Sequence, residues 1–215
     1  MIKVKICCIQ SIAEAQIAIN NDAYAIGLVS KMPSGPGVIS ESKIREIAKW
    51  APDNIKTVLL TSLQNADEII EQHKYCKTDV LQLVDSQKIE TYRTLKKELP
   101  DIELMQVIHV NDERSITESI EISKYVDLLL LDSGNPNLET KELGGTGKTH
   151  NWQISREIVD QVDVPVFLAG GLNPNNVKEA IQTVKPFGVD VCSGVRTDGK
   201  IDAVKVRRFI DEVTK

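Results

Sequence analysis

The apolar residues of the chain gather into eight short runs, and each run is followed by a segment with apolar positions at helical spacing. Runs that are apolar at nearly every position are typical of strands buried on both faces of a sheet. The predicted strands are Lys3 to Cys8, Tyr24 to Ser30, Ile55 to Thr61, Asp79 to Val84, Ile102 to Val110, Val126 to Asp132, Val164 to Ala169 and Gly188 to Cys192.

Capping signals mark the starts of several helices between these strands. Ser11 with Glu14 three residues later predicts a capping box, and Ser40 opens the second helix. Asn173 is the predicted N-cap of the seventh helix, and Pro174 is its predicted first residue. The predicted helices run from Ser11 to Asn20, Ser40 to Ala51, Asn65 to His73, Ser86 to Leu99, Glu113 to Lys124, Trp152 to Gln161, Pro174 to Val184 and Ala203 to Val213.

Strict alternation of strands and helices indicates a parallel sheet. Eight units within 215 residues predict a closed (β/α)₈ TIM barrel, formed by residues 1–215 as a single domain. The alternative is a doubly wound open sheet. That fold would have to accommodate a first strand–helix turn, Cys8 to Ser11, that lacks the glycine pattern of dinucleotide-binding sheets.

Composition narrows the class of protein. The net charge of −5 and the absence of a basic stripe argue against a nucleic-acid partner. The sequence has no apolar stretch long enough for a membrane span, and its first residues enter a strand pattern without a signal peptide. Of the four cysteines, Cys7 and Cys8 are neighbours, which do not form ordinary disulfides. We therefore expect a cytoplasmic protein with no disulfide, zinc site or membrane partner.

Candidate chemistry lies at the carboxyl ends of the strands, where barrel active sites are found. Asp132 ends strand six before a loop of roughly 19 residues and is the candidate acid. Glycine turns at Gly170-Gly171 and Ser193-Gly194 follow strands seven and eight, which is typical of a barrel phosphate site. Cys7 ends strand one and is the candidate base or nucleophile, although a free cysteine on a strand is more often a small buried hydrophobe.

Other motifs carry less weight. The stretch Gly144 to Thr149 is similar to a phosphate-binding P-loop, but Glu142 stands where the first glycine of that motif is required. His150 is interpreted as a loop side chain rather than a ligand. Trp50 and Trp152, at a helix end and a helix start, are interpreted as packing residues.

Several segments together resemble the phosphoribosylanthranilate isomerase family of tryptophan biosynthesis, and the resemblance spans essentially the whole chain. It implies a (β/α)₈ barrel and an Amadori rearrangement of an N-phosphoribosyl amine from aldose to ketose, with no metal or organic cofactor. The segments that carry it are Lys5-Ile6-Cys7, Gln82, Asp132, Gly144 to Thr149, Trp152, Leu168 to Ile181 and Gly188 to Val195.

The resemblance also implies roles for individual residues. Asp132 would be the general acid that opens the ribose ring, and Cys7 the general base that removes the C2′ proton. Gln82 would contact a phosphorylated sugar-amine substrate, bound by a monomer or homodimer. The backbone amides that would hold the phosphate belong to Gly145, Gly147, Gly170, Gly171, Ser193 and Gly194.

The chain departs from the family pattern at several positions. Cys8 stands where the family has glycine, and Gly37 stands where it has the arginine that grips the anthranilate carboxylate. Val84, Asn151 and Arg196 also differ from the family residues. Loss of a bidentate arginine–carboxylate contact is not minor, since such bonds are among the strong ones.

Two alternatives therefore stay open: the same chemistry on a different amine, or a non-catalytic protein that binds a phosphosugar. On this basis we expect weak or absent activity on phosphoribosylanthranilate, improved by Gly37→Arg. The expectation holds unless Lys31 or Arg196 supplies the missing charge.

Overall fold

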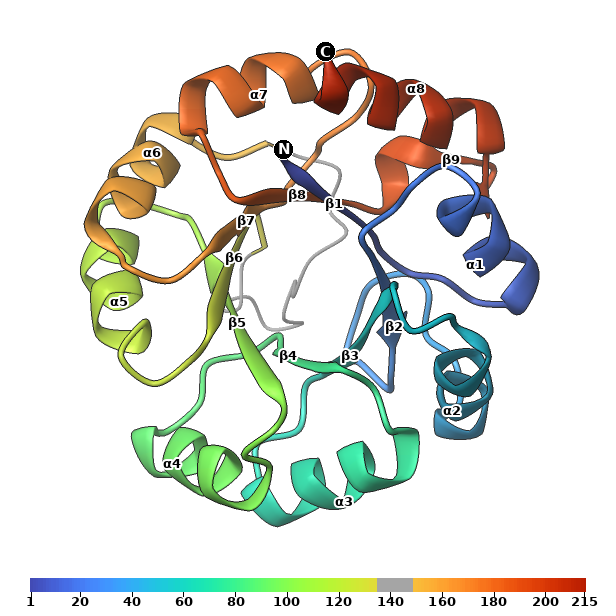
Figure 1. The fold of residues 1–215 in the computed structure, drawn as a ribbon. Helices are drawn as coiled ribbons and strands as arrows, with labels where there is room; N and C mark the ends of the chain where they lie inside the picture. The colour runs from blue at the N-terminus through green and yellow to red at the C-terminus, as the bar shows by residue number, and fades with distance from the viewer. Residues whose placement is uncertain (135–148) are drawn as a thin grey trace.

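The computed structural model describes residues 1–134 and 149–215. Eight parallel strands form a closed barrel in the order of the chain, and helices surround it (Figure 1). The strands are β1 (Lys3–Ile6), β2 (Ala25–Val29), β3 (Lys56–Thr61), β4 (Val80–Leu83), β5 (Glu103–His109), β6 (Leu128–Asp132), β7 (Val166–Leu168) and β8 (Gly188–Val191).

Pairing of β8 with β1 closes the barrel, with Lys3 opposite Gly188 and Ile6 opposite Val191. The predicted TIM barrel is thereby confirmed, and the open-sheet alternative is wrong. The helices are α1 (Ile12–Ile19), α2 (Glu41–Trp50), α3 (Ala66–Cys76), α4 (Ile89–Glu98), α5 (Arg114–Ile122), α6 (Trp152–Gln161), α7 (Val177–Val184) and α8 (Ala203–Thr214).

Alternation along each strand divides the apolar side chains into two layers. In β3, Leu59 belongs to the core between the sheet and the helices, whereas Val58 and Leu60 belong to the core inside the barrel. Phe167 fills part of that interior, and a Cβ on the facing Gly188 would lie 2.4 Å from its ring. The interior is thus packed with side chains near its amino end, which leaves the carboxyl end for a site.

The predicted caps of the first two helices are confirmed. Ser11 Oγ accepts from the Glu14 amide, Glu14 in turn accepts from the Gln10 amide, and Ser40 Oγ accepts from the Lys43 amide. These bonds satisfy amides that have no partner within the helix.

The predicted start of the seventh helix is wrong. The helix begins at Val177, because residues 174–176 form a turn in which Asn173 Oδ1 accepts from the Asn175 amide and Asn176 Oδ1 accepts from the Asn173 amide. The helix predicted from Ser86 begins only at Ile89. A short hairpin of β9 (Arg196–Thr197) and β10 (Lys200–Ile201) was not predicted.

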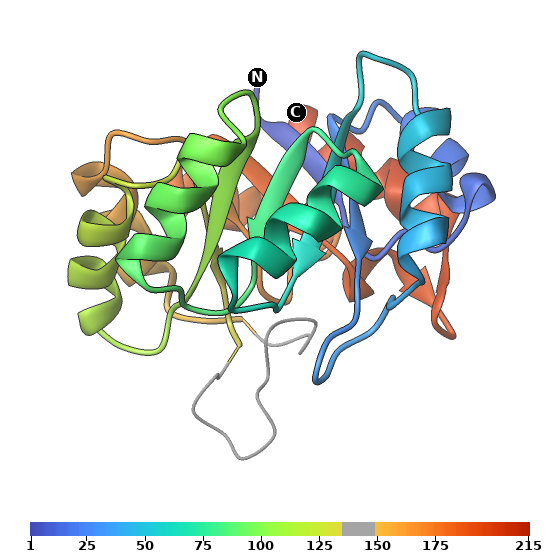
Figure 2. The same cartoon turned by 90° about the horizontal axis from the view of Figure 1, so that it is seen from below.

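Figure 2 shows the barrel from the side, with both termini at the amino end of the strands. The long connection from β2 to α2 extends from the opposite end. Within the described ranges, no helix has the length and apolar character needed to cross a membrane.

Candidate active site

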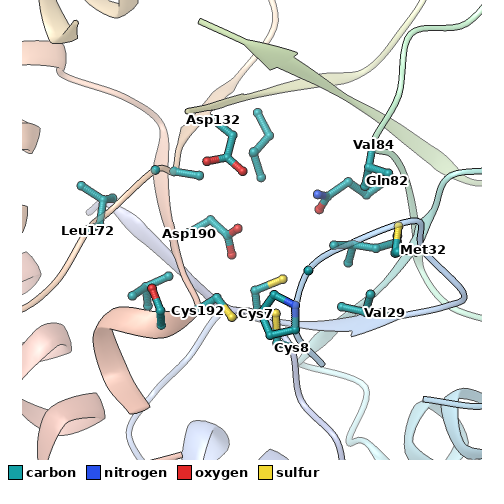
Figure 3. Close-up of a pocket in the computed structure, with 18 of the residues that line it drawn as sticks. Cys7, Cys8, Val29, Met32, Gln82, Val84, Asp132, Leu172, Asp190 and Cys192 are labelled. Atoms are coloured by element: carbon teal, nitrogen blue, oxygen red, sulfur yellow. Dashed lines mark hydrogen bonds between the residues drawn. The ribbon is translucent and has the colours of Figure 1, made fainter. Parts of the chain in front are cut away.

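A pocket of about 710 Å³, a volume that includes its open mouth, lies at the carboxyl ends of the strands. Side chains from β4, β6 and β8, together with Cys7 directly after β1, point into it from different sides (Figure 3). The pocket brings together six of the predicted site residues, namely Cys7, Gln82, Asp132, Gly170, Gly171 and Ser193. Gly145 and Gly147, with the rest of 144–148, lie outside the described residues.

Cys7 follows the last residue of β1, and its amide donates to the Val191 carbonyl of β8 at 2.8 Å. The side chain is buried but borders the pocket. Its pKa lies below the usual thiol value because the Cys8 side chain donates a hydrogen bond to it. Burial opposes this shift, while the Lys5 ammonium supports it. The arrangement favours a Cys7 thiolate, the form that can act as a base.

Cys8 occupies a left-handed backbone conformation, with φ of 63°, which non-glycine residues rarely adopt. Cys192 Sγ donates to Cys8 Sγ at 2.7 Å. The pKa of Cys8 is raised well above the ordinary thiol value, first by its bond with Cys192 and then by its bond with Cys7. Cys8 therefore stays protonated and serves Cys7 as a hydrogen-bond donor.

A buried ion pair lies among these thiols. Lys5 Nζ is 2.9 Å from Asp190 Oδ1, and the lysine side chain is fully buried. Burial is the largest single influence and acts to lower the pKa of Lys5, but attraction to Asp190 and to the Cys7 and Cys8 thiols, together with the hydrogen bond to Asp190, outweighs it and the pKa is raised. Sequence reasoning missed this pair as part of the site. The signal was present, because Lys5 and Asp190 are ionisable residues that alternate with apolar ones in two buried strands.

Asp132 is the last residue of β6, and its side chain points into the pocket (Figure 3). Burial raises the pKa of its carboxyl group, an effect opposed by a 2.7 Å bond from the Ser133 amide and by the nearby His109. A buried carboxyl group with a raised pKa keeps its proton at higher pH, as a general acid requires.

Gln82 lines the pocket from β4 and is 3% exposed. Its Oε1 atom has no hydrogen-bond partner among the described residues. A buried amide oxygen without a partner carries a desolvation cost that a ligand hydroxyl could relieve. The geometry thus suits the predicted substrate contact.

The glycine turns after β7 and β8 lie on one side of the pocket. Gly170 and Gly171 have φ of 82° and 62°. The short helix η1 (Ser193–Val195) follows β8, and Gly194 within it packs so closely that a Cβ would lie 1.9 Å from the Leu172 carbonyl oxygen. Gly170, Gly171 and Ser193 of these two turns line the same pocket, and glycine turns after strands seven and eight are where barrels commonly bind phosphate.

His150 lies beside the first of these turns, a placement that the sequence did not indicate. A Cβ on Gly170 would lie 3.0 Å from His150 Nδ1, an atom without a hydrogen-bond partner in the described part of the chain. Its other ring nitrogen bonds Ser155 Oγ at 2.7 Å. Burial lowers the pKa of His150 to about 4, so the ring is neutral near pH 7.

Of the two cations considered as substitutes for the missing arginine, Arg196 is engaged elsewhere. Its guanidinium bonds both carboxylate oxygens of Glu14 at 3.1 Å and also donates to the Cys8 carbonyl. The side chain is 8% exposed. Neither Arg196 nor Lys31 is among the residues that line the pocket.

Comparison with known proteins agrees with this geometry. The family model described as N-(5'-phosphoribosyl)anthranilate (PRA) isomerase matches residues 4–212. A relative from Methanocella arvoryzae with that name is 33% identical over 99% of this chain and 98% of its own length. Another from Methanocaldococcus jannaschii is 31% identical over 100% of this chain and 98% of its own.

Solved structures give the same result. Phosphoribosylanthranilate isomerase from Thermotoga maritima superposes with a TM-score of 0.85 at 30% identity, covering 100% of this chain and 99% of that one. A second structure, at a TM-score of 0.82 and 27% identity, covers the same shares of both chains and holds reduced 1-(o-carboxyphenylamino)-1-deoxyribulose 5-phosphate. The chain therefore belongs to the N-(5'-phosphoribosyl)anthranilate isomerase family, whose members are isomerases of tryptophan biosynthesis.

Proposed function

We propose that the chain catalyses the Amadori rearrangement of an N-phosphoribosyl amine, with Asp132 as general acid and Cys7 as general base. The observation that carries the proposal is that Cys7 and Asp132 line one pocket from different strand ends, and the directions of their pKa shifts support it. The carboxyl group is shifted toward its protonated form and the thiol toward its ionised form. A reaction that needs one proton donor and one proton acceptor at the same sugar matches this pair.

The steps follow from these protonation states. Asp132 protonates the ring oxygen, the bond from C1′ to that oxygen breaks, and the amine nitrogen forms a double bond to C1′. Cys7 then removes the C2′ proton. The electron pair of the broken C2′–H bond forms the C1′–C2′ double bond, and the electrons of the C1′–N double bond return to the nitrogen, which becomes neutral. The resulting enaminol becomes the ketone as its hydroxyl proton moves to C1′. A proton passing from Cys7 to Asp132 through solvent resets the site.

The rest of the pocket supports binding. The turns at Gly170-Gly171 and Ser193-Gly194 would hold the phosphate through backbone amides, and Gln82 would donate to or accept from a ribose hydroxyl. The partner is thus a phosphorylated sugar amine. Four free thiols support a cytoplasmic location, and a neighbouring isomerase structure described as dimeric leaves a monomer or a homodimer as the assembly.

Two variants test the proposal. Cys7→Ala and Asp132→Asn should each lower kcat by about 100-fold or more, the usual contribution of a general acid or base. The assay follows turnover of phosphoribosylanthranilate through the loss of anthranilate fluorescence. Cys76→Ala is the matched control, since Cys76 is a buried cysteine on α3 and does not line the pocket. Near-normal kcat in Cys7→Ala, with control and variant equally folded by circular dichroism, would remove Cys7 as the base.

A further inference from the structure

Two thiols face each other across the seam where the barrel closes (Figure 3). Cys8 lies beyond the end of β1 and Cys192 directly follows β8, and their sulfur atoms are 2.7 Å apart. A disulfide bond is about 2.05 Å long, so the two sulfurs need to approach by well under an ångström. The Cys7 amide already joins the two strand ends through its bond to the Val191 carbonyl. The strand ends are therefore fixed side by side before any bond forms between the sulfurs.

Other contacts hold Cys8 in this place. Arg196 donates to the Cys8 carbonyl and is itself bound to Glu14 on α1. The loop after β2 packs so closely that a Cβ on Gly37 would lie 2.5 Å from Cys8 Cβ and 3.2 Å from Cys8 Sγ. These contacts confine the Cys8 side chain beside Cys192.

A small oxidant can reach the two thiols through the pocket, because both cysteines line it. Cys192 is only partly buried, whereas Cys8 is 6% exposed. Cys192 is therefore the sulfur that an oxidant meets first, and Cys8 is the thiol that completes the bond. Disulfides in cytoplasmic proteins are usually transient and redox-sensing, which suits a bond that forms only under oxidation.

We propose that Cys8 and Cys192 are a reversible oxidation site, at which hydrogen peroxide converts the two thiols into a disulfide that lowers the activity of the neighbouring Cys7. The Cys192 sulfur attacks one peroxide oxygen and the O–O bond breaks. The released hydroxide takes the Cys192 thiol proton, so a sulfenic acid and one water form. The Cys8 sulfur then displaces the sulfenic hydroxyl group, which leaves as a second water with the Cys8 proton. The two sulfurs lose two electrons in total, and the peroxide gains them.

The bond has two consequences. Cys8 loses the proton that it donates to Cys7, so the Cys7 thiolate loses the hydrogen bond that favours it most. This effect on activity rests on the proposed function, whereas the bond itself does not. The bond also joins residues 184 positions apart. A cross-link that closes so long a loop restricts the unfolded chain and stabilises the folded one.

The test treats the natural protein, Cys192→Ser and Cys7→Ala with hydrogen peroxide and maps their peptides by mass spectrometry without reduction. The natural protein and Cys7→Ala should both show the peptide of Cys8 joined to that of Cys192, and Cys192→Ser should not. Cys76→Ala is the control, because it keeps both thiols of the site. Oxidation should raise the urea midpoint of the natural protein and leave that of Cys192→Ser unchanged.

Activity is measured on the same samples. As the cross-linked fraction grows, kcat/KM for phosphoribosylanthranilate at a fixed pH should fall by about tenfold or more, as the loss of one hydrogen bond to a charged group allows. Dithiothreitol should restore it.

Each outcome has a separate meaning. Absence of the cross-linked peptide, or a cross-link at Cys7 in place of Cys8, overturns the proposal. Full activity in the cross-linked protein also overturns it, as does an equal loss in Cys192→Ser that dithiothreitol reverses. Absence of turnover in the reduced natural protein overturns the proposed function instead. The peptide map and the urea midpoint then still decide whether Cys8 and Cys192 form the bond.

Discussion

Cys7 and Cys8 follow β1, and the protonation of Cys7, the proposed base, depends on its neighbour Cys8. The largest contribution that lowers the pKa of Cys7 is the hydrogen bond from the Cys8 side chain. Cys8→Ala removes the donor and should raise the pKa of Cys7, whereas Cys8→Ser keeps a hydroxyl donor and should largely preserve it. Both replacements must adopt the same left-handed conformation as Cys8, so backbone strain is matched between them.

The hydrogen bond from Cys8 favours the charged form of Cys7, and a hydrogen bond to a charged group contributes about 1.5–3 kcal/mol. Loss of the bond should therefore raise the pKa of Cys7. Because the thiolate is the active form, the ascending limb of the profile of kcat/KM against pH should move to higher pH, and kcat/KM at a fixed pH on that limb should fall by about tenfold or more.

Two measurements check this sign and size. The first is the pH profile of kcat/KM for the natural protein, Cys8→Ala and Cys8→Ser. The second is the pH dependence of Cys7 alkylation by iodoacetamide, read by peptide mass spectrometry. Cys76 is an internal control, since burial raises its pKa to about 12. An unchanged limb in Cys8→Ala, or an equal shift in Cys8→Ser, would refute the reasoning.

Two further predictions concern the ion pair and the phosphate turn. Lys5→Met leaves the buried Asp190 without its partner and should lower the free energy of unfolding by about 3–5 kcal/mol. The double variant Lys5→Met/Asp190→Leu removes both charges and should lower it by less. Urea denaturation measures both values, and an equal or larger loss in the double variant would contradict this reasoning. Gly194→Ala forces a Cβ against the Leu172 carbonyl oxygen and should raise KM by distorting the turn after β8. Gly199→Ala is the control, because Gly199 has φ of 77° but a Cβ built on it would have no atom within 4 Å. This control should lose about 1 kcal/mol of stability and keep its KM. Equal KM values for these two variants would show that the turn at Gly194 does not bind phosphate.

The barrel could be predicted from sequence because its determinants are local and repeat eight times. Each apolar run, such as that ending at Asp132, encodes a strand buried on both faces, and each cap, such as Ser11, encodes a helix start. The seventh helix was misplaced because asparagine side chains compete for backbone amides. The Asn176 side chain accepts from the Asn173 amide and the Asn173 side chain accepts from the Asn175 amide, so the helix begins only at Val177.

The candidate site was predicted only in part, because local patterns show where strands end but not which distant residues the barrel brings into contact. Strand ends can be read from the sequence, and a barrel brings them to one face, so Cys7, Asp132 and the glycine turns could be named as candidates. The contact between Lys5 and Asp190 joins residues 185 positions apart and depends on the register between β1 and β8. No local pattern encodes that register, so neither partner could be assigned to the other before the fold was known.

Positions 8 and 37 show how the meaning of a substitution depends on its neighbour in space. From the sequence, Gly37 is a lost arginine and Cys8 is an unrelated change, which led to the expectation that Gly37→Arg alone would improve efficiency. The structure places the two positions in contact, with 2.5 Å between a Cβ at 37 and Cys8 Cβ. A side chain at position 8 therefore leaves no room for one at position 37 while the backbone stays as it is. Gly37→Arg by itself would displace Cys8 and weaken its bond to Cys7, so the single variant should lose activity, whereas Cys8→Gly/Gly37→Arg removes the contacts with the Cys8 side chain.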